Sequence, residues 1–502
     1  MHTRPCILAR LVDTLMTLVL SFGFVLVTDS HAAAKVEKSD SWQVIYLSGQ
    51  RIGYAHSSTE PFEQDGQEMV RSTTIANMTI KRFGQSLVMK TTLITEETFD
   101  GELRKFSYES ANPPASSTST MGTITGDTLK LKQTVNGKTK ESTQAWRKEV
   151  KSPAYQDRLL KESPLKTGEL RSFEAFMPEF NKVATIKLQA AAELEDATLL
   201  EGKIRKLLKI KMTQSVLPGM VMNAFVDDKG EAIKTGTSML GTEMAFYLVD
   251  KDEALKVISG AELDLAVSTL VKVKKIPNAH TTKSVKYRVT TKGKDSEGFL
   301  PSGESQKVTK VSDEVSEVTV IALPIPDKAV IKDVGAEFLA ATQFLQSDDE
   351  RVKDHANKAA GDETDPAQIA RRMEKYVHQK LDKKNFSTAM ASAGEVARTL
   401  EGDCTEHAVL LAGMLRAKGI PSRVVVGLVY VDSLSAFGGH MWTEANLDGH
   451  WIPLDATLGR GGIGGAHLKL SDSSLNDDGP SALSSFAPLM LVIGQMQIEV
   501  LE

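Results

Sequence analysis

Residues 404–418 (CTEHAVLLAGMLRAK) carry apolar side chains around almost the whole circumference of a predicted helix. A helix without a polar face is stable only where other elements cover it on all sides. Asp403 precedes the segment as a natural N-cap, Glu406 follows three residues later as in a capping box, and Gly419 stands where the helix should end. The chain must therefore fold into a domain that encloses this helix and places Cys404 at its first position.

The first position of a helix is chemically special for a thiol. The unpaired N–H groups and the positive end of the helix dipole favour a thiolate there, and the same N–H groups can hold an oxyanion that develops beside the sulfur. The sequence has two cysteines, Cys6 and Cys404. A buried structural cysteine is the alternative, because cysteine is a common small apolar side chain in protein cores. The capped helix start favours a reactive thiol.

The N-terminus has the order of a secretory signal. Arg4 and Arg10 precede an apolar run that Asp13 interrupts, and the small residues of 30–34 follow. This order predicts a signal peptide over residues 1–34, cleavage among the small residues, and a periplasmic or secreted chain with no membrane span after cleavage. An uncleaved N-terminal anchor is the alternative, although the run is short for a span. Cleavage would remove Cys6 and leave one unpaired thiol in an oxidising compartment, where structural cysteines normally come in pairs.

A length of 502 residues suggests two to four domains. Residues 41–260 alternate apolar and polar side chains with a period of two, which predicts antiparallel sheet with one solvated face. Asn136 and Gly137, between alternating flanks, predict a tight hairpin. We therefore expect an α+β chain with four parts: a signal peptide at 1–34, an antiparallel β-rich domain at 35–260, a second β-rich module and linker at 261–330, and a catalytic domain at 331–502.

The pattern changes to a helical period after residue 330. Residues 336–345 (AEFLAATQFL) predict a helix, residues 355–365 a polar break, and residues 365–381 a helix that Asp365 caps with proline in its first turn. Residues 392–400 predict another short helix. The glycine-rich residues 460–465 (RGGIGG) predict an ordinary surface loop, with a mobile flap as the alternative.

A predicted hairpin places His440 beside a carboxylate. Residues 448–449 (Asp-Gly) are a two-residue turn signal. With that turn, Asp455 faces Trp442 and is a diagonal neighbour of His440 on the same face of the ribbon, within reach of its side chain. The predicted register pairs Leu447 with His450, Ala445 with Ile452, Thr443 with Leu454 and Met441 with Ala456. A carboxylate beside an imidazole holds one tautomer and makes a better base.

Cys404, His440 and Asp455 together match the pattern of nucleophile, base and orienting carboxylate. His407 lies one turn after Cys404 and is a second candidate base, but it has no obvious carboxylate to orient it. A metal site that combines Cys404, His407, His440 and Asp455 is a further alternative. Glu444 is either a second carboxylate near the site or a solvated, ion-paired surface residue.

Three motifs in this order, GDCTEHA, GIPSRVVVGLVY and HMWTEANLDGHWIPLDAT, resemble the bacterial transglutaminase-like superfamily, which has a papain-like Cys-His-Asp fold. The resemblance covers residues 365–458. It implies that Cys404 is the nucleophile, His440 the general base and acid, and Asp455 the orienting residue, with Trp442 packed beside them.

Members of that superfamily break or exchange amide bonds. The resemblance thus implies a thiol-dependent peptidase, amidase or acyltransferase that forms a thioester, with no cofactor or metal expected. Because the N-terminus predicts export, we expect its substrates to be peptides or proteins of the cell envelope. It also implies a side-chain oxyanion donor before the cysteine, for which Gln379 and Asn385 are the candidates. A net charge of only −5 argues against a nucleic-acid partner. The alternative is a non-catalytic cell-envelope binding or scaffolding protein with a vestigial triad.

Overall fold

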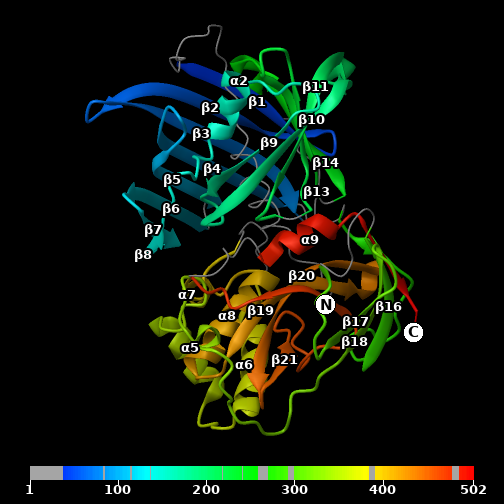
Figure 1. Ribbon diagram of the computed structural model, residues 1–502. Coiled ribbons are helices and arrows are strands. Elements are labelled where there is room, and N and C mark those ends of the chain that lie inside the picture. The colour runs from blue at the N-terminus through cyan, green and yellow to red at the C-terminus, as the bar shows by residue number, and fades with distance from the viewer. Residues whose placement is uncertain are drawn as a thin grey trace. The chain divides into compact units, whose positions relative to one another are not determined.

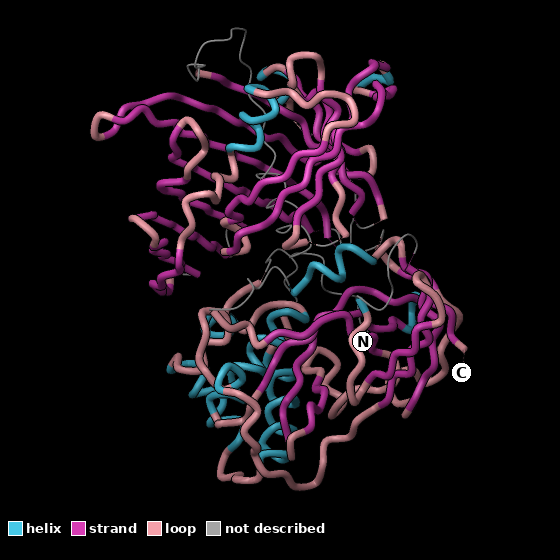
Figure 2. The backbone as a smooth tube through the Cα atoms, viewed as in Figure 1, coloured by secondary structure: helices cyan, strands magenta, loops and turns pink. Residues whose placement is uncertain are grey.

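The computed structural model describes residues 38–82, 85–112, 116–135, 137–217, 219–239, 241–257, 269–291, 299–383, 390–477 and 485–501. The chain forms an N-terminal unit of residues 13–81 and 88–263 and a C-terminal unit that holds residues 264–502. The first is built almost wholly of strands, whereas helices gather in the second (Figure 2). The predicted signal peptide and Asn385 lie outside the described residues. Within the described ranges, no helix has the length and apolar character needed to cross a bilayer.

The N-terminal unit contains one antiparallel sheet of fourteen strands, as its alternating sequence predicts. The strands follow the order β8-β7-β6-β5-β4-β3-β2-β1-β14-β13-β12-β11-β10-β9, so that two meanders join where β1 pairs with β14 (Figure 1). Their bounds are β1 Ser39–Leu47, β2 Gln50–Gln64, β3 Gln67–Arg82, β4 Gln85–Thr98, β5 Leu103–Asn112, β6 Ser116–Thr125, β7 Thr128–Val135, β8 Lys138–Ala145, β9 Leu170–Met177, β10 Lys182–Thr198, β11 Ile204–Gln214, β12 Met222–Val226, β13 Ala232–Met239 and β14 Thr242–Val249. The predicted hairpin is confirmed, because Val135 pairs with Lys138.

A short segment at Lys151 connects β9 to the start of β5. The backbone N–H of Lys151 donates to the carbonyl of Glu174 at 2.8 Å, and the N–H of Phe176 donates to the carbonyl of Lys151 at 3.0 Å. On its other side, Lys151 forms an antiparallel bridge with Glu102. The rings of Phe106 and Phe176 lie 5.2 Å apart and are both buried. The two meanders therefore meet through this segment around an aromatic interior.

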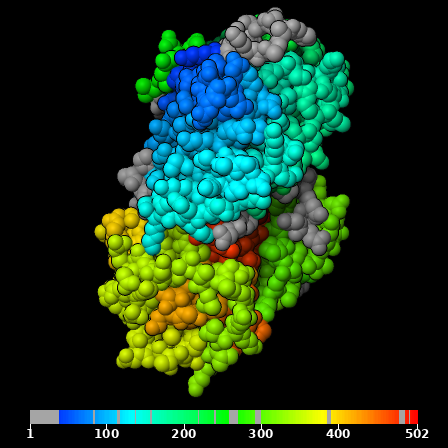
Figure 3. Space-filling model, turned by 60° about the vertical axis from the view of Figure 1, so that its left-hand side comes forward, coloured from blue at the N-terminus to red at the C-terminus, as the bar shows by residue number. Residues whose placement is uncertain are grey.

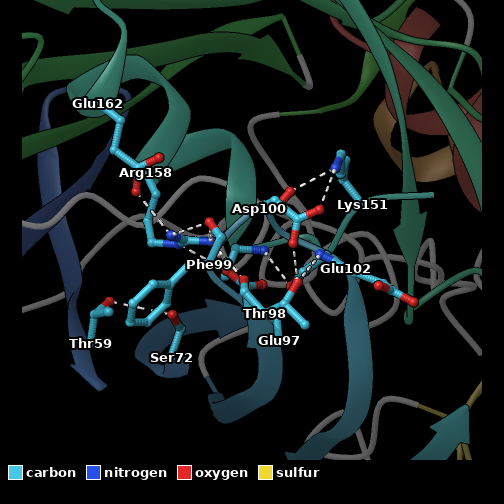
Figure 4. Close-up of polar contacts among 12 residues, drawn as sticks. Thr59, Ser72, Glu97, Thr98, Phe99, Asp100, Glu102, Lys151, Arg158 and Glu162 are labelled. Carbon is cyan, nitrogen blue, oxygen red and sulfur yellow. Dashed lines mark hydrogen bonds and ion pairs between the residues drawn. The ribbon is translucent and has the colours of Figure 1, made fainter. Parts of the chain in front are cut away.

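Helix α2 (Tyr155–Glu162) is held to the sheet by a buried ion pair. Nε of Arg158 donates to Oε1 of Glu97 at 2.9 Å, and Nη1 donates to the carbonyl of Phe99 at 3.1 Å (Figure 4). The exposed fractions of the two charged side chains are 7% and 0%. Burial raises the pKa of Glu97, although the charge of Arg158 opposes this shift. Each charge therefore depends on the other, since an unpaired buried charge is costly.

The C-terminal unit contains two antiparallel sheets. One has the order β15-β20-β19-β22, with β21 also paired to β20, and the other has the order β17-β18-β16-β23. Their bounds are β15 Val271–Lys272, β16 Ser284–Thr291, β17 Gln306–Lys310, β18 Val315–Ile321, β19 Ser422–Val431, β20 Ala436–Leu447, β21 His450–Leu454, β22 His467–Ser473 and β23 Met496–Val500.

The C-terminal unit also includes the strands that we expected in a separate module at 261–330. β16 pairs on one side with β18 and on the other with β23, which lies at the end of the chain. β15 pairs with β20. These strands therefore find their partners in the last part of the sequence, which a composition-based boundary at 330 does not reveal.

Helix α8 (Cys404–Ala417) is the enclosed helix that the sequence predicts. Helices α5 (Glu350–Ala360), α6 (Pro366–Lys380) and α7 (Ala393–Thr399) pack against it, and so do β19 and β20. All its residues from Cys404 to Arg416 are buried. The yellow-green residues of the α5 and α6 region instead form much of the visible surface of this unit (Figure 3). Helix α9 (Ala487–Val492) precedes β23.

Two of the predicted features between residues 336 and 365 are wrong. The helix expected at 336–345 is only a 3₁₀ turn, η3 (Ala336–Phe338). The backbone of this segment bonds to distant side chains instead: Arg416 donates to the carbonyl of Ala340, and the N–H of Gln343 donates to Asp477. The polar break expected at 355–365 is largely helix α5, because Asp349 caps that helix. An apolar stripe on α5 packs inward through Val352, Ala356 and Ala360.

We expect Arg158→Met to destabilise the N-terminal unit by about 3–5 kcal/mol, because it leaves the charge of Glu97 buried without its partner. The double variant Glu97→Leu/Arg158→Met should recover most of that loss. Denaturant-dependent hydrogen exchange of peptides from residues 88–112 measures the change. Lys203→Met breaks an exposed pair with Glu201 and serves as the control. Equal stability of the single and double variants would contradict the argument.

Candidate active site

Cys404 is the first residue of α8, as predicted. The side chain of Asp403 accepts a hydrogen bond from the N–H of Thr405 at 3.0 Å, and Oε2 of Glu406 accepts one from the N–H of Asp403 at 3.0 Å. The predicted capping box is therefore present. It places the thiol at the positive end of the helix, where a thiolate is favoured. The exposed fraction of Cys404 is 0%, so this thiol lies wholly beneath the surface.

The hairpin of β20 and β21 has the predicted register. Leu447 pairs with His450, Ala445 with Ile452 and Thr443 with Leu454, while Met441 and Ala456 lie beyond the end of the ladder. As a result, Nε2 of His440 lies 2.8 Å from Oδ2 of Asp455. The two side chains are 2% and 0% exposed.

The hydrogen bond to Asp455 sets the tautomer of His440. An ionised carboxylate only accepts, so Nε2 carries the proton and Nδ1 keeps its lone pair. Within the described part of the chain, Nδ1 of His440 has no hydrogen-bond partner. Nδ1 is therefore the atom of the ring that can take a proton.

The second oxygen of Asp455 is held by backbone groups. Oδ1 accepts from the N–H of Thr457 at 2.9 Å and from the N–H of Leu458 at 3.2 Å. Burial alone would raise the pKa of Asp455, but its charge interaction and hydrogen bond with His440, followed by those with His467, hold it well below its usual range. Asp455 is therefore an ionised carboxylate fixed from two sides.

His467 is a member of this cluster that the sequence did not reveal. It begins β22, and its Nε2 lies 3.0 Å from the same Oδ2 of Asp455 that His440 contacts. Burial lowers the pKa of His467, which keeps its ring neutral. The sequence separation of His440 and His467 does not predict their contact, because β22 pairs with β19 and is not part of the hairpin of β20 and β21. Only the strand order brings the two rings together.

Aromatic rings surround the two imidazoles. The ring of Trp442 lies 6.2 Å from that of His440, nearly parallel to it, and 5.3 Å from that of His467, nearly perpendicular to it. The ring of His280 lies 6.1 Å from that of His467. Burial, followed by the nearby His467, lowers the pKa of His280 to about 4. A further neutral imidazole, that of His280, therefore packs against His467.

The remaining candidates lie in other surroundings. Nδ1 of His407 is hydrogen-bonded to the carbonyl of Asp403 within its own helix. Gln379 is exposed on α6, whereas Asn385 lies outside the described residues.

Glu444 is ion-paired, but the expected surface position is wrong, because its exposed fraction is 1%. It bonds Nε of Arg423 at 2.7 Å and Nζ of Lys469 at 2.9 Å. The three charged side chains come from the neighbouring strands β19, β20 and β22, which stack them across the sheet. Glu444 therefore ties these strands together.

Buried Glu374 connects α6 to the loop after β21. Its Oε1 accepts from the N–H of Asp455 at 3.1 Å and from the N–H of Gly462 at 3.1 Å. Burial raises the pKa of Glu374 to about 7. The glycine-rich segment that we expected at the surface is buried over residues 463–465. A Cβ added at Gly464 would lie 2.5 Å from the backbone of His280, so this part of the loop needs glycine to pack closely.

Ligand-type atoms of His440, Asp455 and His467 lie within 4.8 Å of one another, which raises the question of a metal ion. The set expected from Cys404, His407, His440 and Asp455 does not form such a group in the described ranges. Zinc at about 2.0–2.1 Å from each ligand keeps tetrahedral ligand atoms roughly 3.3 Å apart. The observed distances of 2.8 and 3.0 Å to one shared oxygen instead fit two hydrogen bonds. The three side chains therefore form a hydrogen-bonded cluster.

Comparisons with known proteins support the resemblance seen in the motifs. Residues 353–456 match the transglutaminase-like superfamily. No curated protein sequence matches the chain.

Solved structures with some similarity include a candidate cysteine protease from Cytophaga hutchinsonii, at 15% identity over 44% of this chain and 81% of that one, with a TM-score of 0.30. A β-barrel-like protein of a domain of unknown function from Brucella abortus shares 9% identity over 42% and 96%, with a TM-score of 0.30. A candidate protease from Parabacteroides distasonis shares 14% over 70% and 64%, with a TM-score of 0.20. At these scores the similarities carry no argument about function.

We expect Glu374→Gln to remove a pH dependence of stability. The raised pKa means that the folded chain retains a proton that the unfolded chain releases between pH 4.5 and about 7. The free energy of unfolding of the wild type therefore falls across this window, by roughly 3 kcal/mol from this group. Glutamine keeps the acceptor oxygen without the charge, so the variant should be more stable than the wild type above pH 7.

Urea unfolding at pH 5 and pH 8 measures this difference. Glu350→Gln, at a side chain that is 88% exposed, is the matched control. Parallel pH profiles for the wild type and Glu374→Gln would show that Glu374 does not hold the extra proton.

Proposed function

Because residues 353–456 match the transglutaminase-like superfamily, we propose that this chain is a thiol-dependent enzyme that acts on amide bonds. Cys404 is the nucleophile, His440 the base and acid, and Asp455 the residue that orients His440. The observation that carries the proposal is the hydrogen bond from Nε2 of His440 to Asp455, which leaves Nδ1 free to exchange a proton.

The reaction follows from these roles. Nδ1 of His440 takes the proton of the Cys404 thiol, and the sulfur attacks the carbonyl carbon of an amide. The C–N bond breaks, the amine leaves with the proton from His440, and a thioester remains on the sulfur. Water or a second amine then attacks the thioester and restores the thiol. The N–H groups at the start of α8 are suited to stabilise the oxyanion of each tetrahedral intermediate.

The packing of α8 supports the pairing of this thiol with this imidazole. α8 lies against β20, the strand that carries His440. Oγ1 of Thr443 on β20 donates to the carbonyl of Ala408 on α8 at 2.9 Å, which fixes the two elements together one turn beyond the thiol.

Access to the thiol is the main requirement that the fold sets. Because Cys404 is fully buried, a substrate reaches the sulfur only after the residues that cover it have moved. The same burial favours a second candidate function, a cell-envelope binding or scaffolding protein whose large N-terminal sheet does the work. The reactivity of the thiol in the folded protein separates the two.

We also propose that the enzyme is exported and acts on peptides or proteins of the cell envelope. The basic, apolar and small residues of 1–34 have the order of a signal peptide. An exported enzyme of this kind would meet peptides or proteins of the cell envelope. Sequencing the N-terminus of the protein recovered from the periplasm or the medium tests export, and an intact Met1 in the membrane fraction would instead indicate an anchor.

We expect Cys404 to react with iodoacetamide at pH 7 about tenfold or more faster than glutathione does, because a helix start and an oriented imidazole favour the thiolate. A chain with Cys6→Ser has Cys404 as its single thiol. Asp455→Asn should slow the reaction roughly tenfold or more, since the base loses its oriented tautomer. Mass spectrometry of the modified peptide measures the rates.

Cys404→Ala is the control that should abolish labelling. A thiol that reacts more slowly in the folded protein than in urea would contradict an enzyme and favour the scaffold. In the presence of a glutamine-containing peptide, hydroxylamine should trap the thioester as a hydroxamate, which checks the covalent intermediate directly.

A further inference from the structure

We propose that His467 is a positioning residue that acts through Asp455, by sharing the carboxylate oxygen to which His440 is bonded and so limiting how firmly His440 holds its proton. This inference rests on the proposed function.

The two imidazoles compete for one oxygen. Oδ2 of Asp455 lies 2.8 Å from Nε2 of His440 and 3.0 Å from Nε2 of His467. A hydrogen bond to a carboxylate oxygen is weaker when that oxygen also accepts a hydrogen bond from a second donor. The N–H of His467 therefore reduces the ability of Asp455 to stabilise an imidazolium at His440.

His467 is not needed to orient the carboxylate. The other oxygen, Oδ1, is held by the N–H groups of Thr457 and Leu458 at 2.9 and 3.2 Å. The backbone N–H of Asp455 is itself bonded to Glu374. The carboxylate is thus anchored without either histidine, and loss of the His467 donor changes the charge on Oδ2 more than its position.

The ring of His467 is fixed as a neutral donor. An ionised carboxylate accepts only, so Nε2 of His467 carries the proton. Its Nδ1 has no hydrogen-bond partner among the described residues. Trp442 and His280 pack against the ring, and Val429 of β19 pairs with it across the ladder. The donor therefore keeps its place while His440 gains and loses a proton.

Other titratable and charged groups lie on the elements that pack near the pair, and a test must leave them unchanged. They are Glu374 on α6, Cys404 and His407 on α8, Glu444 and its partner Lys469 on β20 and β22, His280 with Asp432 beside it, and Arg460 after β21. A substitution confined to His467 leaves all of them in place, so a change in pH dependence can be assigned to the lost donor.

The test compares His467→Phe with His467→Gln in the Cys6→Ser chain. Phenylalanine keeps the ring and its packing but removes the donor, whereas glutamine places an N–H near the position of Nε2. The pH dependence of Cys404 alkylation by iodoacetamide reports two midpoints, and at the upper one the imidazolium loses its proton. We expect His467→Phe to raise this midpoint by about one pH unit, a tenfold change in proton affinity, and His467→Gln to restore the wild-type value.

The outcomes are distinct. A structural role alone would change thermal stability in both variants without moving the midpoint, and would overturn the inference, as would equal shifts in the two variants. If His467→Phe does not fold, His467→Met replaces it, because methionine matches glutamine in length and lacks the donor.

A wild-type profile that changes on dialysis against EDTA would assign the cluster to a metal ion and also overturn the inference. A wild-type thiol as slow as glutathione, with one midpoint, marks instead the failure of the proposed function, and the inference falls with it.

Discussion

The carboxylate of Asp455 is the interaction on which the candidate site depends. It is wholly buried, yet its pKa lies well below the usual range because its charge interactions and hydrogen bonds with His440 and His467 outweigh the effect of burial. Two backbone N–H groups bond its other oxygen. A buried charge survives only where its partners are already in place. These partners come from β20, from β22 and from the turn after β21, so the charge is stable only when the sheet has its complete strand order.

Local features of the site could be predicted from the sequence. The capping box before Cys404 and the Asp-Gly turn of the hairpin involve residues a few positions apart, and both are confirmed. Such features depend on backbone geometry that short segments determine by themselves. The position of His440 beside Asp455 followed from the same register.

Features that depend on tertiary pairing could not be predicted in this way. His467 contacts Asp455 only because β22 lies beside β19, and Glu374 on α6 accepts the backbone N–H of Asp455, 81 positions later in the sequence. The mistaken helix at 336–345 has the same cause. Its backbone groups are satisfied by Arg416 and Asp477, which lie far along the chain, and this outweighs a favourable local pattern.

The pairing of β16 with β23 has a consequence for biosynthesis. The ribosome makes β16 (Ser284–Thr291) long before β23 (Met496–Val500). Every strand of the N-terminal sheet is translated earlier, so that unit can complete its ladder while synthesis continues. The second sheet of the unit that holds Cys404 must wait until β23 has been translated before β16 gains its second partner strand. A premature stop codon before β23 would therefore leave β16 with an open edge and expose the truncated protein to aggregation and proteolysis.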